Sequence, residues 1–150
     1  MKTETQFSVF LVNKPGVLAQ VCDELAKAKV NIVALTMMDS SEHGVLRLVA
    51  QNTEKAREVL RRLDVPMTET EVLVVEMSNR PGAMADVCGR LAASHVNVNY
   101  AYVTTGVAGG RACAVLKVAD TKRGMAILSE RKPRRKVSRK KVRPSPASRR

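Results

Sequence analysis

Apolar positions in the first half of the chain alternate in some stretches and recur at helical spacing in others, which predicts the order strand, helix, strand, strand, helix, strand. The strands are expected at residues 7–12, 30–38, 44–51 and 67–70. The first helix is expected to open at Pro15, and the second to be capped by Thr53 and to end before Pro66. Their apolar stripes comprise Leu18, Val21, Cys22 and Leu25 in the first, and Ala56, Val59, Leu60 and Leu63 in the second.

The second half repeats this order, with strands expected at residues 72–77, 96–104 and 112–119. Its first helix carries the stripe Met84, Val87, Cys88 and Leu91, and its second begins near Thr121. Residues 105–110 are rich in glycine, but they lack the Lys of a phosphate-binding loop and precede a strand, so a flexible hairpin is predicted. The second half has no clear equivalent of the fourth strand expected at 67–70. This strand is either missing, or residues 137–142 supply a poor one.

The two halves are copies of one module. The segment Asn13-Lys14-Pro15-Gly16-Val17-Leu18 returns in the second half as Asn79-Arg80-Pro81-Gly82-Ala83-Met84, and Val30-Asn31 returns in the same register as Val96-Asn97. The fold class expected from this order is α+β, with two ferredoxin-like βαββαβ units, each with an antiparallel sheet. The expected domains are residues 1–70 and 71–131. Units this small are marginal alone and should pack together.

Charge separates a third segment from these two units. The chain has a formal net charge of +12, but eleven of its 26 Lys and Arg residues lie at positions 131–150, where there is no acid. The remaining fifteen bases meet fourteen acids, so the folded part is close to neutral. Residues 132–150 are therefore expected to form a basic, disordered tail.

The sequence favours a reducing, cytoplasmic location without a membrane segment. The three cysteines are an odd number, and Cys22 and Cys88 occupy equivalent places on apolar helix stripes, which fits buried thiols better than disulfides. The amino terminus has no apolar signal-peptide core, and no uncharged apolar run reaches the ~18 residues that span a bilayer.

The distinctive residues of both modules cluster where the first strand meets the first helix. Gly16 and Gly82 allow close backbone approach, and the free N–H groups of a helix start can receive a carboxylate. Asn13 lies on the first of these loops, and Asn31 is expected to begin the neighbouring strand. Amide oxygens and a helix start together suit the ammonium and carboxylate groups of an amino acid.

An Asn-x-Pro-Gly-Val-Leu segment before an amphipathic helix and a Val-Asn-Ile strand, present twice, resembles the ACT-domain family of small-molecule-binding regulatory modules. In serine-regulated phosphoglycerate dehydrogenases the family motif reads His-x-Asn-x-Pro-Gly, with another Asn eighteen residues after the first; the histidine positions here are Leu11 and Met77. The resemblance implies a regulatory module that binds a small amino acid at the interface of the two units, and Leu11 and Met77 favour a hydrophobic amino acid over serine. The implied ligand-binding residues are Asn13, Pro15, Gly16, Val17, Leu18, Asn31, Asn79, Pro81, Gly82, Ala83, Met84 and Asn97.

No catalytic role is expected, because neither histidine lies in a motif typical of a metal site or a triad, and no cofactor or metal is implied. The expected partners are an amino acid, further copies of the chain and a separate regulated metabolic enzyme. Two alternatives stay open. The basic tail could bind nucleic acid or another polyanion without specificity, or the chain could be a purely structural pairing module.

Overall fold

The computed structural model describes residues 1–38, 43–107 and 109–130 of the 150-residue chain. The basic tail, its candidate strand at 137–142 and most of the turn at 39–43 lie outside the described residues. In chain order the elements are β1 (Lys2–Val12), α1 (Val17–Lys27), β2 (Ile32–Met38), β3 (His43–Ala50), α2 (Thr53–Arg62), β4 (Met67–Ser78), α3 (Ala83–Ala93), β5 (Val98–Thr105), β6 (Arg111–Val118) and α4 (Thr121–Ser129).

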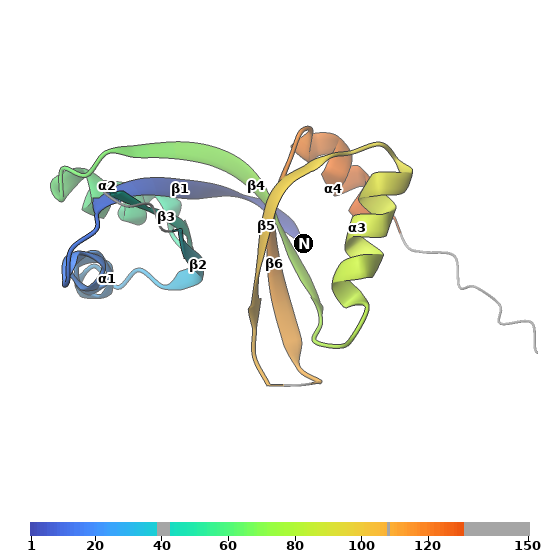
Figure 1. Ribbon diagram of the computed structural model, residues 1–150, viewed down its shortest axis with the longest axis horizontal. Helices are drawn as coiled ribbons and strands as arrows, with labels where there is room; N and C mark the ends of the chain where they lie inside the picture. Colours follow the sequence, from blue (N-terminus) through green and yellow to red (C-terminus); the bar gives the residue numbers. More distant parts are fainter. Residues whose placement is uncertain (39–42, 108, 131–150) are drawn as a thin grey trace, which may run out of the picture.

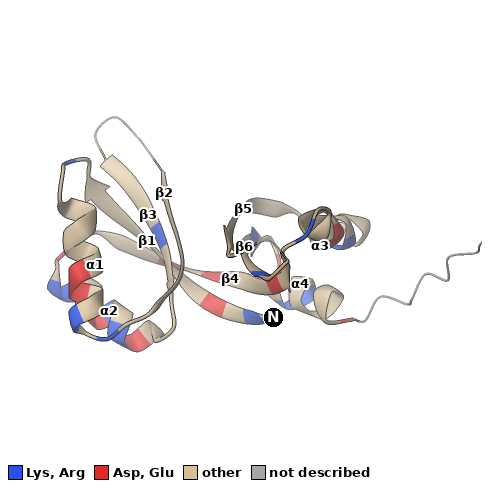
Figure 2. Ribbon diagram, turned by 90° about the horizontal axis from the view of Figure 1, so that it is seen from below, with Lys and Arg blue, Asp and Glu red and all other residues tan. Residues whose placement is uncertain are grey.

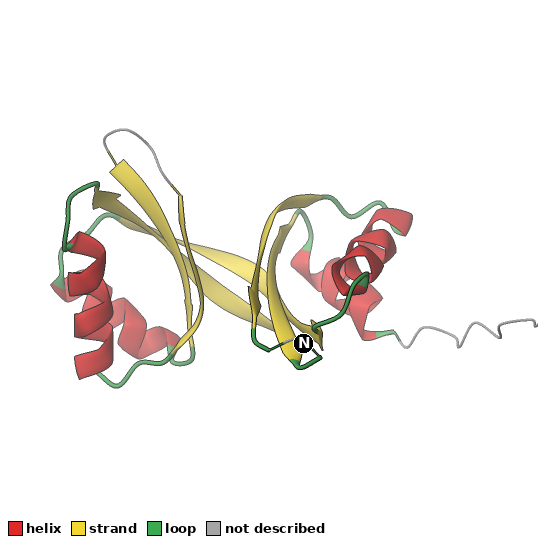
Figure 3. Cartoon of the chain, turned by 60° about the horizontal axis from the view of Figure 1, so that its bottom comes forward, coloured by secondary structure: helices red, strands yellow, loops and turns green. Residues whose placement is uncertain are grey.

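The strands form one antiparallel sheet in the order β2-β3-β1-β4-β6-β5. Helices α1 and α2 lie at one end of the molecule and α3 and α4 at the other, with the strands between them (Figures 1 and 3). The α+β class with two ferredoxin-like halves is thereby confirmed. None of the helices in the described part of the chain is long and apolar enough to cross a membrane.

Strand β1 belongs to both halves of the sheet. Its carboxyl-terminal part pairs with β3, while residues from Lys2 to Val9 pair with β4. The expectation of a strand at 7–12 was therefore too short. Residues 2–6 pair with β4. In a ferredoxin-like unit this is the position of the fourth strand, so the amino-terminal part of β1 takes the place of the fourth strand that the second unit lacks. Residues 2–6 are all polar, so apolar spacing does not predict this strand.

Strand β4 is shared in the same way. It runs without a break through residue 70, where the first unit was expected to end, and continues as the first strand of the second half. The register is symmetric under the sequence repeat: Lys2 lies opposite Val74, and their equivalents in the other module, Thr68 and Ser8, also lie opposite each other. The two modules thus exchange equivalent strand segments across the β1–β4 pair.

The sheet folds over itself. Strands β3 and β5 are four positions apart in the strand order, which would separate them by about 19 Å in a flat sheet. Yet the Arg47 guanidinium on β3 lies 3.7 Å from the ring centroid of Tyr100 on β5. The two sheet faces that the helices leave uncovered, here called the inner faces, therefore oppose each other across the middle of the molecule.

Three buried clusters follow from this arrangement. One lies under α1 and α2 and includes Phe7, Leu25, Leu48 and Leu60, and a second lies under α3 and α4 around Leu73, Leu91 and Leu116. The third joins the inner faces and contains Ala34, Val49, Val72, Val74 and Val115. Burying these aliphatic side chains stabilises each half and the contact between the halves.

Helix starts differ from the sequence predictions by one or two residues. Helix α2 is capped by the Asn52 side chain, which accepts a hydrogen bond of 3.0 Å from the Lys55 N–H, so the prediction of Thr53 as the cap was wrong. Helix α1 begins at Val17 with Gly16 as its N-cap, so Pro15 precedes the helix. Cys22, Cys88 and Cys113 are free thiols and half-buried, less enclosed than expected.

Candidate functional site

The two Asn-x-Pro-Gly loops have the same backbone geometry. Gly16 and Gly82 cap α1 and α3 with φ of 88° and 82°, in the left-handed region that favours glycine. Because glycine has no side chain, neither of these N-cap residues can cap its helix with a side-chain hydrogen bond. The loops therefore need glycine for their turn, as well as for any approach by a ligand.

The surroundings of the two loops differ. Around Gly16, no heavy atom outside its chain neighbours in the described residues lies within 4 Å of the place that a Cβ would take. At Gly82, Arg80 folds back over the loop: it donates to the Pro81 carbonyl at 3.1 Å and pairs with Asp86 at 2.9 Å. The start of α3 is thus partly occupied by its own side chains, whereas the start of α1 is open.

The predicted residues do not converge within one unit. Strand β3 lies between β1 and β2, so the prediction that Asn31 begins the strand next to β1 was wrong. The register places the end of β1 near His43 and the start of β2 near Ala50. Asn13 and Asn31 consequently lie at opposite ends of the first half-sheet. The same holds for Asn79 and Asn97 in the second half, since the Asn79 N–H donates to the Gly110 carbonyl and the Ala119 N–H donates to the Asn97 carbonyl.

The remaining predicted residues contribute to the helix starts. Val17 and Leu18 pack against the first core, Ala83 is buried, and Met84 packs against the second core. Pro15 and Pro81 are exposed. Leu11 is 1% exposed in the first core and Met77 packs against the second, so both positions where the related motif has histidine face the helices.

A wide-open cavity of about 650 Å³ lies at the surface where the inner faces meet, and residues of both halves line it. The first half contributes Asn31 and Gln51, and the second half contributes Thr104 and Gly106 at the end of β5. The Asn79 side chain donates to the carbonyls of Gly106 and Val107, each at 3.2 Å. Two of the predicted asparagines therefore lie in this region: Asn31 in the cavity wall and Asn79 at the loop whose carbonyls it holds.

Among the described residues, three charged ones line the cavity. Glu76 on β4 pairs with Arg111 on β6 at 2.5 Å between Oε2 and Nη2. Lys2 comes from the exchanged end of β1 and forms an ion pair with Glu4. Spacing within either module did not predict these residues, because the strand exchange brings Lys2 to the site and the charges have no counterpart in the repeated motif.

Cys113 also lines the cavity. Burial and the nearby Glu76 carboxylate raise the pKa of its thiol. The thiol is therefore protonated near neutral pH and is a weak nucleophile.

Next to the cavity, a polar cluster joins the inner faces. The Gln6 side chain is fully buried; its amide donates to the Tyr100 hydroxyl at 2.7 Å and accepts from the Tyr102 hydroxyl at 3.1 Å. Arg47 stacks on Tyr100, and its buried Nε has no hydrogen-bond acceptor within the described part of the chain. Burial raises the pKa of Tyr102. These residues couple β1 and β3 to β5.

Comparisons with known proteins agree with this architecture. A family model described as an ACT domain pair matches residues 2–139. The crystal structure of protein BT0572 from Bacteroides thetaiotaomicron superposes with a TM-score of 0.77 at 30% identity, covering 84% of this chain and 86% of that one. The comparison with curated protein sequences gives no match.

Two more distant structures share the fold. The regulatory subunit of aspartate kinase from Thermus thermophilus, in its ligand-free form, aligns with a TM-score of 0.65 at 13% identity over 85% of this chain and 93% of that one. The same subunit from Thermus flavus aligns with a TM-score of 0.59 at 15% identity over 85% and 89%. The family match covers nearly the whole described sequence, and the chain therefore belongs to the ACT domain pair family.

Proposed function

We propose that this chain is a non-catalytic regulatory module that binds a small amino acid between its two halves and thereby controls a separate enzyme of amino-acid metabolism. The observation that carries the proposal is the cavity of about 650 Å³, which both halves line and which holds carboxylate, guanidinium, ammonium and amide groups. A ligand with one positive and one negative group can be bound there by opposite charges and hydrogen bonds.

The family match and the regulatory subunits among the similar structures support a regulatory role. Protonation of Cys113, the thiol in the cavity wall, supports binding over covalent catalysis. In this proposal Asn31 contacts the ligand, and Asn79 positions the rim by holding the 106–107 backbone. The open loop at Gly16, which does not line the cavity, is the alternative location for the carboxylate of this one ligand.

Regulation follows if the ligand favours one arrangement of the two halves. A molecule that contacts both inner faces stabilises the arrangement in which they oppose each other, by the difference between its affinities for the two arrangements. A partner enzyme that binds one arrangement better would then respond to the ligand. This mechanism requires no chemistry on the amino acid.

Thermal unfolding in the presence of each of the twenty amino acids at millimolar concentration tests the proposal. Selective binding to the folded chain should raise the midpoint for one amino acid or a small group, and the matching D-enantiomer serves as the control. If none of the twenty raises the midpoint, amino-acid binding is refuted and the structural pairing alternative becomes the better one.

Equivalent asparagines in the two halves give a matched pair of variants. Asn31→Ala should weaken binding of the selected amino acid by about 0.5–1.5 kcal/mol, the contribution of one hydrogen bond. Asn97→Ala, at the same position of the other module, should leave the affinity unchanged. Asn13→Ala tests the open loop; a valine at Gly16 would be strained at φ of 88° whether or not a ligand bound there.

A further inference from the structure

We infer that the chain binds one amino acid, as a zwitterion with an uncharged side chain, by opening the Glu76–Arg111 ion pair, and that the equivalent position of the other module is inactive. This inference rests on the proposed function. It adds the anchoring groups, the class of side chain and the number of sites, none of which follows from the duplicated loop motif.

The anchoring groups lie on adjacent strands of one inner face. Glu76 and Arg111 come from the paired strands β4 and β6, and Lys2 comes from β1 on the other side of β4. The side chains of Glu76 and Arg111 remain 54% and 80% exposed. Because an exposed ion pair contributes little to stability, a ligand can separate it at small cost.

A zwitterion replaces each partner of that pair with a like group. The ligand ammonium takes the place of the Arg111 guanidinium at the Glu76 carboxylate. The ligand carboxylate takes the place of Glu76 at Arg111, and Lys2 adds a second cation. Both charges of the ligand are then paired, which a simple carboxylate or a simple amine would not achieve.

The rest of the cavity wall favours an uncharged ligand side chain. Val33, Val74, Ala112 and Cys113 supply apolar or weakly polar surface, and Thr104 adds a hydroxyl. Lys2, Glu76 and Arg111 are the charged residues among the described lining residues, and the two ends of the zwitterion engage all three. A third ligand charge would be partly removed from water without a partner.

The sequence repeat shows that the other module lacks these anchors. The register that aligns Asn13 with Asn79 places Phe10 at the position of Glu76 and Thr68 at that of Lys2. Past the longer hairpin of the second half, the register that aligns Thr53 with Thr121 places His43 at the position of Arg111. Phe10 is 40% exposed. A phenyl ring cannot accept an ammonium as a carboxylate does, so of the two modules only the second has the pair at this position among the described residues.

Isothermal titration calorimetry of the full chain with the amino acid that raises the midpoint most tests this inference. The expected stoichiometry is one ligand per chain. The 2-oxo acid and the amine with the same side chain, which lack the ammonium and the carboxylate respectively, should each bind about tenfold to a hundredfold more weakly. Glu76→Gln and Arg111→Gln should cause losses in the same range.

Arg80→Gln is the matched control, because Arg80 and Asp86 form another exposed ion pair, outside the cavity. It should bind the amino acid as the parent chain does. Two ligands per chain, or unchanged affinity in both Glu76→Gln and Arg111→Gln, would overturn the inference and leave amino-acid binding intact. Failure of the parent chain to bind any amino acid would overturn the proposed function and this inference together.

Discussion

Gln6 shows how one polar residue can determine the contact between two modules. It lies on the shared strand β1, is fully buried, and its amide group bonds to two tyrosines of the second half and, at 3.3 Å, to Ser8. A buried amide is tolerated when its donors and acceptors are satisfied, and it then fixes the positions of its partners. Gln6 therefore specifies how β5 lies against β1.

Replacing Gln6 by leucine should lower the free energy of unfolding by about 1–3 kcal/mol, because the hydroxyls of the half-buried Tyr100 and Tyr102 lose their partner. Urea unfolding followed by circular dichroism measures this change. Ser8→Ala, which removes only the longest of these bonds, should have a smaller effect. Combining Gln6→Leu with Tyr102→Phe should cost less than the sum of the single changes, and strict additivity would contradict the coupling.

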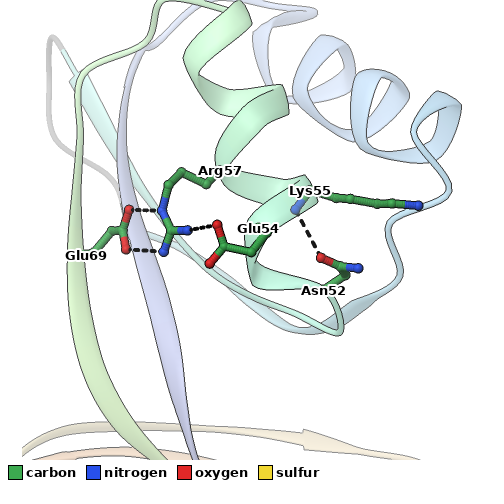
Figure 4. A network of polar contacts seen from close by, with 5 residues as sticks. All are labelled: Asn52, Glu54, Lys55, Arg57 and Glu69. Carbon is green, nitrogen blue, oxygen red and sulfur yellow. Dashed lines mark hydrogen bonds and ion pairs between the residues drawn. The ribbon is translucent and has the colours of Figure 1, made fainter.

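At the scale of elements, an ion-pair network ties α2 to the first part of β4. Arg57 donates to both Glu69 carboxylate oxygens, at 2.6 and 2.8 Å, and to Glu54 at 2.5 Å (Figure 4). Elsewhere on α1 and α2, charges of both signs are interspersed (Figure 2). The hydrogen bonds from Arg57 lower the pKa of Glu69, so the folded chain favours its ionised form.

This lowered pKa predicts a pH dependence. The stabilisation by Glu69 should be fully present above the pKa of an unfolded glutamate and should disappear as the pH falls through the lower folded value. Because the Glu69 side chain is 35% exposed, the contribution should be at most about 1 kcal/mol. Unfolding of the parent and Glu69→Gln should differ at neutral pH and converge in acid. A constant difference would assign the stabilisation to another group.

Elements also show what could be predicted from the sequence. The four helices and most strand cores follow from apolar spacing, since each has one face against a core. The first residues of β1 do not, because Lys2-Thr3-Glu4-Thr5-Gln6 contains no apolar residue and pairs with positions 70–74, in the other module. The cavity could not be predicted for the same reason. Lys2 and Glu76 line it together only because β1 of the first module pairs with β4 of the second, and this pairing is not visible within either module's sequence.

At the scale of the whole molecule, the exchange of strand segments between β1 and β4 predicts that residues 2–5 contribute to stability and that residues 132–150 do not. A chain that ends at Arg131 should fold with unchanged circular dichroism, because residues 2–6 already lie beside β4. A chain without residues 2–5 should unfold at a lower temperature, since β4 loses its pairing partner at residues 71–74 and the cavity loses Lys2. Failure of the first variant to fold would assign the tail a structural role that the β1–β4 pairing does not require.

The shared strands also predict how the molecule unfolds. Strands β1 and β4 each belong to both halves, and the third buried cluster lies between the inner faces. Unfolding one half would remove strand partners from the other and expose aliphatic surface on both sides. Units of this size are marginally stable alone, so the remaining half should not persist. Calorimetry should therefore record one transition with equal calorimetric and van't Hoff enthalpies. Two separate transitions, or an isolated half that keeps its structure, would show that the halves are independent despite their common sheet.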